Sequence, residues 1–137
     1  MRAAALVLGL LLVFAAPAFA EEEAKVDCAR ATAQPDLNAC AYQEYEAADT
    51  ELNRVYKQAM TAVHTIDNER DGADVGAVEA LKKAQRAWIT YRDGQCELAG
   101  FQARGGQAEP MLVSGCLSEL TQKRTAELKE FLEAQGN

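Results

Sequence analysis

The chain has 137 residues, of which 49% are hydrophobic, and its 21 acidic and 14 basic residues give a formal net charge of −7. This length suits a single domain with a modest core. The acidic excess disfavours nucleic acid and anionic membranes as partners. It is compatible with a basic protein partner, although it also serves solubility.

The N-terminal segment is typical of a secretory signal peptide. Arg2 precedes an apolar run over residues 3–16, and Ala18-Phe19-Ala20 supplies the small residues of a cleavage site. A membrane anchor is the alternative, but the apolar run is short for a span and acidic residues 21–23 follow it directly. We therefore predict a signal peptide over residues 1–20, no membrane anchor after cleavage, and one periplasmic or secreted domain over residues 21–137.

Three long stretches repeat apolar residues at the three- and four-residue steps of a helix. They run from about Asp36 to His64, from about Ala77 to Ala99, and from Pro110 to just before Gly136. Because the connections at residues 67–76 and 100–109 are short, the sequence predicts an all-α, antiparallel three-helix bundle. The expected apolar stripe of the third helix comprises Leu112, Val113, Cys116, Leu120, Leu128 and Phe131.

The four cysteines form an even set, which predicts two disulfides in an oxidising compartment. Cys28, Cys40, Cys96 and Cys116 allow three pairings. We prefer Cys28–Cys40 with Cys96–Cys116, because each bridge then closes a short loop. The spacing does not fit a zinc site, and the only histidine, His64, is distant from every cysteine in sequence.

Several polar residues fall on helix faces that are expected to point into the bundle. In the second helix, Gln85 and Arg92 share the face of Leu81 and Trp88. Since buried polar groups need partners, we predict a buried network in which Arg92, Arg124 or both bridge one carboxylate and align the three helices. The network comprises Asp49, Asn53, Gln85, Arg92 and Arg124. The alternative is a pocket for a small anion or peptide on the Trp88–Arg92 face.

The residues that most catalytic sites require are missing. A catalytic triad would have to be built on His64, no serine lies in a G-x-S-x-G motif, and Gly105-Gly106 lacks the lysine of a phosphate loop. Residues 67–72 resemble the start of an EF-hand, but Val78 stands where its bidentate glutamate belongs. We therefore expect no enzyme activity, no cofactor and no metal site, and we interpret residues 67–72 as a solvated acidic loop.

The motifs together resemble the LprI-like lysozyme-inhibitor N-terminal domain family of small exported bacterial proteins. The resemblance rests on Cys28, Asp36-Leu37-Asn38-Ala39-Cys40, Asp49-x-x-Leu52-Asn53-x-x-Tyr56, Ala84-Gln85-Arg86-Ala87-Trp88-Ile89-x-Tyr91-Arg92-Asp93-x-x-Cys96, Cys116 and Thr121-x-x-Arg124. It covers nearly all of residues 21–137. The family takes its name from a lipoprotein that inhibits lysozyme, and this chain lacks the lipid-attachment cysteine of that protein.

The resemblance implies a stoichiometric, non-catalytic lysozyme inhibitor. An acidic protein would be steered electrostatically toward a basic lysozyme, and a protruding loop could occlude its cleft. The two connections between helices are the candidate loops, and a cation would suit the catalytic carboxylates of the enzyme better than an acid. Possible partner-binding residues are therefore Arg70, Arg104 and Trp88. The competing hypothesis is an envelope binding module that uses the Trp88–Arg92 face.

Overall fold

A computed structural model describes residues 26–71 and 75–136. Its elements are α1 (Gln34–Asn68), α2 (Ala77–Gly100), the short 3-10 turn η2 (Phe101–Ala103) and α3 (Glu109–Ala134). The predicted helices are confirmed, and α1 is longer than expected at both ends. The predicted signal peptide lies outside the described residues.

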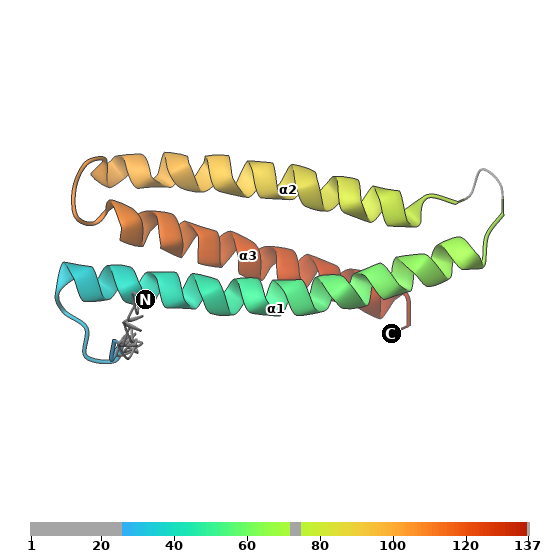
Figure 1. Cartoon of the computed structure of the whole chain (residues 1–137), viewed down its shortest axis with the longest axis horizontal. Helices are drawn as coiled ribbons and strands as arrows, with labels where there is room; N and C mark the ends of the chain where they lie inside the picture. Colours follow the sequence, from blue (N-terminus) through green and yellow to red (C-terminus); the bar gives the residue numbers. More distant parts are fainter. Residues whose placement is uncertain (1–25, 72–74, 137) are drawn as a thin grey trace, which may run out of the picture.

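The three helices form one elongated up-down-up bundle (Figure 1). α2 runs antiparallel to both α1 and α3, and α1 makes its most extensive contact with α3. Within the described residues there is no strand, so the predicted all-α, three-helix class is confirmed. In this part of the chain no helix combines the length and the apolarity needed to cross a membrane.

The interior has two chemically different halves. All members of the aliphatic core cluster lie in one half of the bundle, namely Leu52, Val55, Ala59, Ala62, Val63, Leu81, Leu128 and Leu132. The other half, at the left of Figure 1, buries only small, polar or disulfide-bonded residues. These include Cys40, Ala48, Arg92, Cys96, Ser114, Ser118 and Thr121. Little apolar area is therefore buried there, and hydrophobic stabilisation is concentrated in the first half.

The buried face of α3 differs from the predicted stripe. Ser114, Ser118, Thr121 and Thr125 are buried, whereas Leu112, Val113 and Cys116 are only partly buried. Small side chains suit the interior here because α3 lies close along α1. Two of the hydroxyls find partners within α3: Thr125 Oγ1 donates to the Thr121 carbonyl at 2.9 Å, and Ser118 Oγ accepts from Gln122 Nε2 at 3.0 Å. The fully buried Thr121 hydroxyl has no hydrogen-bond partner among the described residues.

Two disulfides lie in the half that lacks the aliphatic cluster. They join Cys28 to Cys40 and Cys96 to Cys116, which confirms the preferred pairing. The second bridge ties α2 to α3, and Cys96 is completely buried. At the nearby α2–α3 turn, a Cβ added to Gly100 would lie 2.6 Å from Val113 Cγ2, so the two helices approach closely. Covalent links thus stabilise the half in which apolar burial is smallest.

Asp67 at the end of α1 caps the start of α2. Its Oδ1 accepts from the N–H groups of Gly76 and Ala77 at 2.9 and 2.8 Å, and its Oδ2 accepts from Val78 N–H at 3.0 Å. These backbone hydrogen bonds hold the pKa of the Asp67 carboxyl below its usual range. Gly76 has φ 143°, a conformation that only glycine adopts without strain. The carboxylate therefore serves as an N-cap donated from the preceding helix.

Asp67→Asn removes the negative charge at the start of α2 and replaces the Oδ2 acceptor of Val78 N–H by an amide donor, so it should lower the melting temperature at pH 7 by about 2–6 °C. Because the folded-state pKa is lowered, the stabilisation is complete above the ordinary aspartate pKa of about 4 and disappears as the pH falls through the folded-state value. Melting curves from pH 7 to pH 2 should therefore converge for the two proteins. Asp71→Asn, an exposed neighbour, is the matched control. Parallel curves would contradict the capping role.

Candidate functional site

Arg92 is the central polar residue of the interior. Its side chain is 10% exposed, and its Nη2 and Nε atoms each lie 2.8 Å from Asp93 Oδ1. The Arg92 Cζ atom stands 5.0 Å from the ring centroid of Trp88 and 5.6 Å from that of Tyr45. Both rings are within cation–π range, so the guanidinium joins α2 to α1 through aromatic faces as well as charge.

The predicted partners of Arg92 on α1 are at the surface. Asp49 Oδ1 lies 3.8 Å from Arg92 Nη1, and the Asp49 side chain is 39% exposed. Asn53 Nδ2 donates to Asp49 Oδ2 at 2.9 Å, but Asn53 itself is exposed. The expectation that Asp49 and Asn53 would be buried is therefore wrong. Both side chains are accessible to solvent.

Gln85 and Arg124 form a separate cluster. Arg124 Nε donates to Gln85 Oε1 at 3.1 Å, which links α3 to α2. Arg124 Nη1 pairs with Glu127 on its own helix at 2.7 Å, so the guanidinium does not need Asp49. The structure thus divides the five predicted residues into an α1–α2 group of three around Arg92 and an α2–α3 pair of Gln85 with Arg124. The three-helix bridge through a single carboxylate is not formed within the described residues.

The two members of the Arg92–Asp49 pair should differ in their contribution to stability. Asp49→Ala removes a long, solvated ion pair and should cost about 0.5–1 kcal/mol. Arg92→Ala removes a buried side chain packed on two rings and should cost about 2–3 kcal/mol. Urea unfolding of both variants measures the difference. Equal losses would show that the ion pair, rather than the aromatic packing, dominates.

The charge of the molecule is segregated along its length. The half without the aliphatic cluster, defined as residues 34–51 and 88–121 and called here the acidic half, has nine carboxylates and two guanidinium groups, a net charge of −7. The opposite half, residues 52–71, 75–87 and 122–136, has a net charge of +2. Glu51, at the boundary, has its pKa lowered to about 2 by Arg54 and Lys129. The acidic half therefore presents a concentrated negative field, which is a means of attracting a basic partner.

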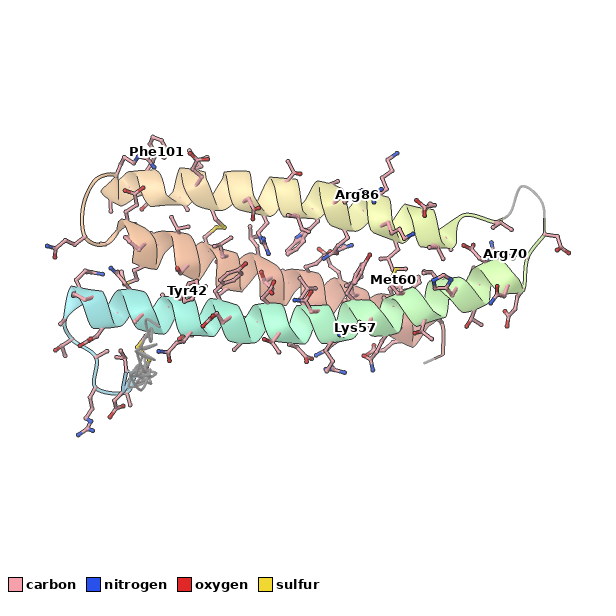
Figure 2. The ribbon with its side chains drawn as sticks, in the orientation of Figure 1. Tyr42, Lys57, Met60, Arg70, Arg86 and Phe101 are labelled. Carbon is pink, nitrogen blue, oxygen red and sulfur yellow. A yellow bond between two sulfur atoms is a disulfide. The ribbon has the colours of Figure 1, made fainter. Side chains whose placement is uncertain are left out.

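The α2–α3 connection lies at the end of the acidic half and is held in place. Arg104 Nη1 pairs with Glu109 at 2.8 Å, and its Cζ atom stands 4.6 Å from the Phe101 ring centroid. Asn38 Nδ2 donates to the Gln107 carbonyl at 2.9 Å, which fastens the connection to α1. Phe101 is 53% exposed and lies on the outer side of the turn (Figure 2). An arginine and an exposed aromatic ring are thus fixed at this end.

Arg70 lies at the opposite end of the bundle, beyond the last turn of α1 (Figure 2). It is exposed, and it precedes residues 72–74, which the structure does not describe. Part of the EF-hand-like stretch falls in that gap. The first carboxylate of the stretch, Asp67, is occupied by backbone N–H groups. Across residues 26–71 and 75–136, His, Cys, Asp and Glu form no cluster suited to a metal ion.

The side chains of Trp88 and Arg92 are largely engaged in contacts within the protein and have few groups left to bind a ligand. The Trp88 side chain is partly buried against the core cluster, and the Arg92 guanidinium is engaged by Asp93 and two rings. A small anion would have to displace Asp93 to reach it. The geometry therefore favours a structural role for this face.

These observations define a small, disulfide-linked helical module with one acidic half. The chain belongs to the LprI family, because the family model described as "Lysozyme inhibitor LprI" matches residues 27–128. The uncharacterized protein R02472 of Rhizobium meliloti (strain 1021) is 61% identical over 140 residues that cover both chains completely. The uncharacterized protein YecT of Escherichia coli (strain K12) is 37% identical over 65 residues, which are 45% of this chain and 39% of YecT. No solved structure matches this chain.

The most informative feature of the site, the charge segregation, follows from sequence only after the helices are aligned. Residues 31–53 contain five acidic residues and no basic one, which is a visible signal. Its effect depends on the bundle topology, because the C-terminal part of α2 and the N-terminal part of α3 add their own acids at the same end.

Proposed function

We propose that this protein binds lysozyme in a stoichiometric complex and inhibits it without catalysis. Membership of the LprI family supports the class of partner. The observation that carries the proposal is the acidic half, in which a net charge of −7 is concentrated at one end of the bundle. Strongly basic lysozymes would be attracted electrostatically to this end of the bundle. A contact made there could then cover the active-site cleft of the enzyme.

The charge distribution favours one of the two candidate loops. The connection at residues 100–109 lies in the acidic half, whereas the connection at residues 67–76 joins helix ends of the opposite half. We infer that the first connection approaches the enzyme. Arg104, stacked on Phe101 and paired with Glu109 through Nη1, is more than half exposed and would direct its remaining N–H donors toward the enzyme carboxylates.

The proposal is tested by the lysis of a cell-wall suspension by a chicken-type lysozyme, run beside other lysozyme classes. Purified, oxidised protein should inhibit with saturation near an equimolar ratio. Inhibition should weaken as salt is raised from about 0.05 to 0.2 M, because screening acts on the exposed charges. Absence of inhibition for every lysozyme class, with the protein folded by circular dichroism, would overturn the proposal.

Charge reversal in each half locates the interaction. Glu44 and Glu46 are exposed residues of α1 in the acidic half, and Glu130 and Glu133 are exposed residues of α3 in the opposite half. The double variant E44K/E46K should slow association at low salt about tenfold or more. E130K/E133K changes the net charge by the same amount and should have a much smaller effect. Equal effects would mean that net charge alone, and not its placement, governs binding.

We also infer that the protein acts after export, in the periplasm or outside the cell. Two disulfides support this, because such bridges persist in oxidising compartments. The N-terminal features described above support removal of residues 1–20. Mass spectrometry of the protein recovered from the periplasmic or secreted fraction should give a chain that begins at Glu21 with four oxidised cysteines. A cytoplasmic, full-length, reduced protein would contradict the inference.

A further inference from the structure

One flank of α2 has an apolar stripe that stays exposed, and its first alanines, Ala80 and Ala84, border a groove shared with Phe131 of α3. Its members follow one another at alternating steps of four and three residues, the spacing of a helix that packs along a second helix. They are Ala80, Ala84, Ala87, Tyr91, Gly94 and Leu98, continued by Phe101 in η2, and all seven are exposed. Tyr91 is 58% exposed, Leu98 64% and Phe101 53%, so the three largest members remain mostly in water.

The stripe is graded in size along the helix. Its N-terminal part contains only alanines, and its C-terminal part contains Leu98 and Phe101. In an antiparallel pair of such helices, Leu98 and Phe101 of one copy would pack on the alanines at residues 80 and 84 of the other. Small residues allow helix axes to approach to about 8 Å. A large exposed apolar surface of this kind on a soluble protein marks an interaction site.

The charges beside the stripe show the same antiparallel complementarity. Lys83 and Glu97 precede stripe residues Ala84 and Leu98, and they flank the same side of the stripe. They are 14 residues apart, about 21 Å along the helix, so they cannot pair with each other within one copy. Within the described residues neither has an ion-pair partner. In an antiparallel pair centred near Thr90, Lys83 of each copy would face Glu97 of the other.

The charge of the whole bundle disfavours the parallel alternative. Parallel pairing along α2 would place two acidic halves, each with a net charge of −7, side by side. Antiparallel pairing places each acidic half next to the opposite half of the other copy, whose net charge is +2. We therefore propose that this exposed flank of α2 binds a second copy of this chain in an antiparallel, two-fold symmetric dimer. A two-fold axis near Thr90 makes every contact occur twice.

Sedimentation equilibrium of the purified, oxidised protein tests this interface. The wild type should show a monomer–dimer equilibrium at or below about 100 µM, and L98E should raise the dissociation constant at least about 100-fold, because it places charge on the apolar stripe. K83E and E97K should each raise it about tenfold, and the double swap K83E/E97K should restore the wild-type value within about threefold. Control swaps at exposed residues of the other helices, K57E and E130K, should leave it unchanged.

The results separate the possible occupants of the stripe. A wild type that remains monomeric over this concentration range would overturn the proposal and leave the stripe to a different protein. A dimer that L98E does not weaken, or a double swap that does not restore association, would place the contact elsewhere. Melting temperatures of all variants, measured at concentrations where each is monomeric, should be equal within a few degrees. This check excludes misfolding as the cause of dissociation.

Discussion

Replacing Cys96 and Cys116 together by alanine should lower the free energy of unfolding by about 3 kcal/mol. This bridge closes a loop of 20 residues in sequence separation, and the loss of this constraint on the unfolded chain is the expected cause. Cys96 is completely buried in the acidic half, where hydroxyls and small residues replace an aliphatic core. Few other interactions there can offset the loss. Chemical denaturation with guanidinium measures the change.

The other disulfide provides the matched control. Cys28–Cys40 has a sequence separation of 12, and Cys28 is exposed near the N-terminal edge of the described residues. The pair Cys28→Ala and Cys40→Ala should therefore be less destabilising than the first pair. Amide hydrogen exchange should in addition show faster opening around Ser114 and Ser118 when Cys96–Cys116 is absent. Removing Cys96–Cys116 should lower the free energy of unfolding more than removing Cys28–Cys40. The reverse order would contradict the division of the interior into an aliphatic half and an acidic half.

Leu52→Ala should destabilise the protein by about 2–5 kcal/mol, the range for deleting a large aliphatic side chain from a packed core. Leu52 is 2% exposed and begins the aliphatic cluster on α1. The cavity would lie at the boundary with the acidic half, where small neighbours cannot move in to fill it. Urea unfolding should show a lower midpoint with a similar slope.

Ile89→Ala is the comparison for this prediction, because Ile89 is an aliphatic residue that is 39% exposed on α2. It should cost about 1 kcal/mol or less, in proportion to the smaller area removed from water. If the two alanine variants unfolded at the same denaturant concentration, the assignment of the stabilising core to the half containing Leu52 would be wrong.

The fold could be predicted from sequence because its signals are local. The helical steps of apolar residues located α1, α2 and α3, and the short loop closures favoured the observed disulfides. The hydroxyl interior could not be predicted in this way. Ser114, Ser118 and Thr121 carry no apolar periodicity, and their burial depends on how closely α3 approaches α1, which is a tertiary property.

The polar residues could be assigned to helix faces, and the pairing of Arg92 with Asp49 could be predicted, but their other partners could not. Helical spacing placed Arg92 on the inner face of α2, and it is buried. Spacing did not reveal that Asp93, the next residue, would take the guanidinium, or that Arg124 would turn to Gln85 and Glu127. For Asp67 the sequence pattern indicates only a solvated acidic loop. Its role as a cap for α2 depends on a return of the chain over nine residues, for which a pattern within one helix gives no signal.

The cap by Asp67 also makes the α1–α2 connection a suitable place to modify the protein. The side chain holds residues 67 and 76–78 together, so the two ends of the connection stay adjacent whatever sequence lies between them. Lengthening a closed loop costs only about 0.6 kcal/mol for each doubling of its length. A fluorescent or affinity tag inserted after Asp71 would thus leave the bundle intact. It would also emerge at the end opposite the acidic half, where it would not obstruct the proposed lysozyme contact.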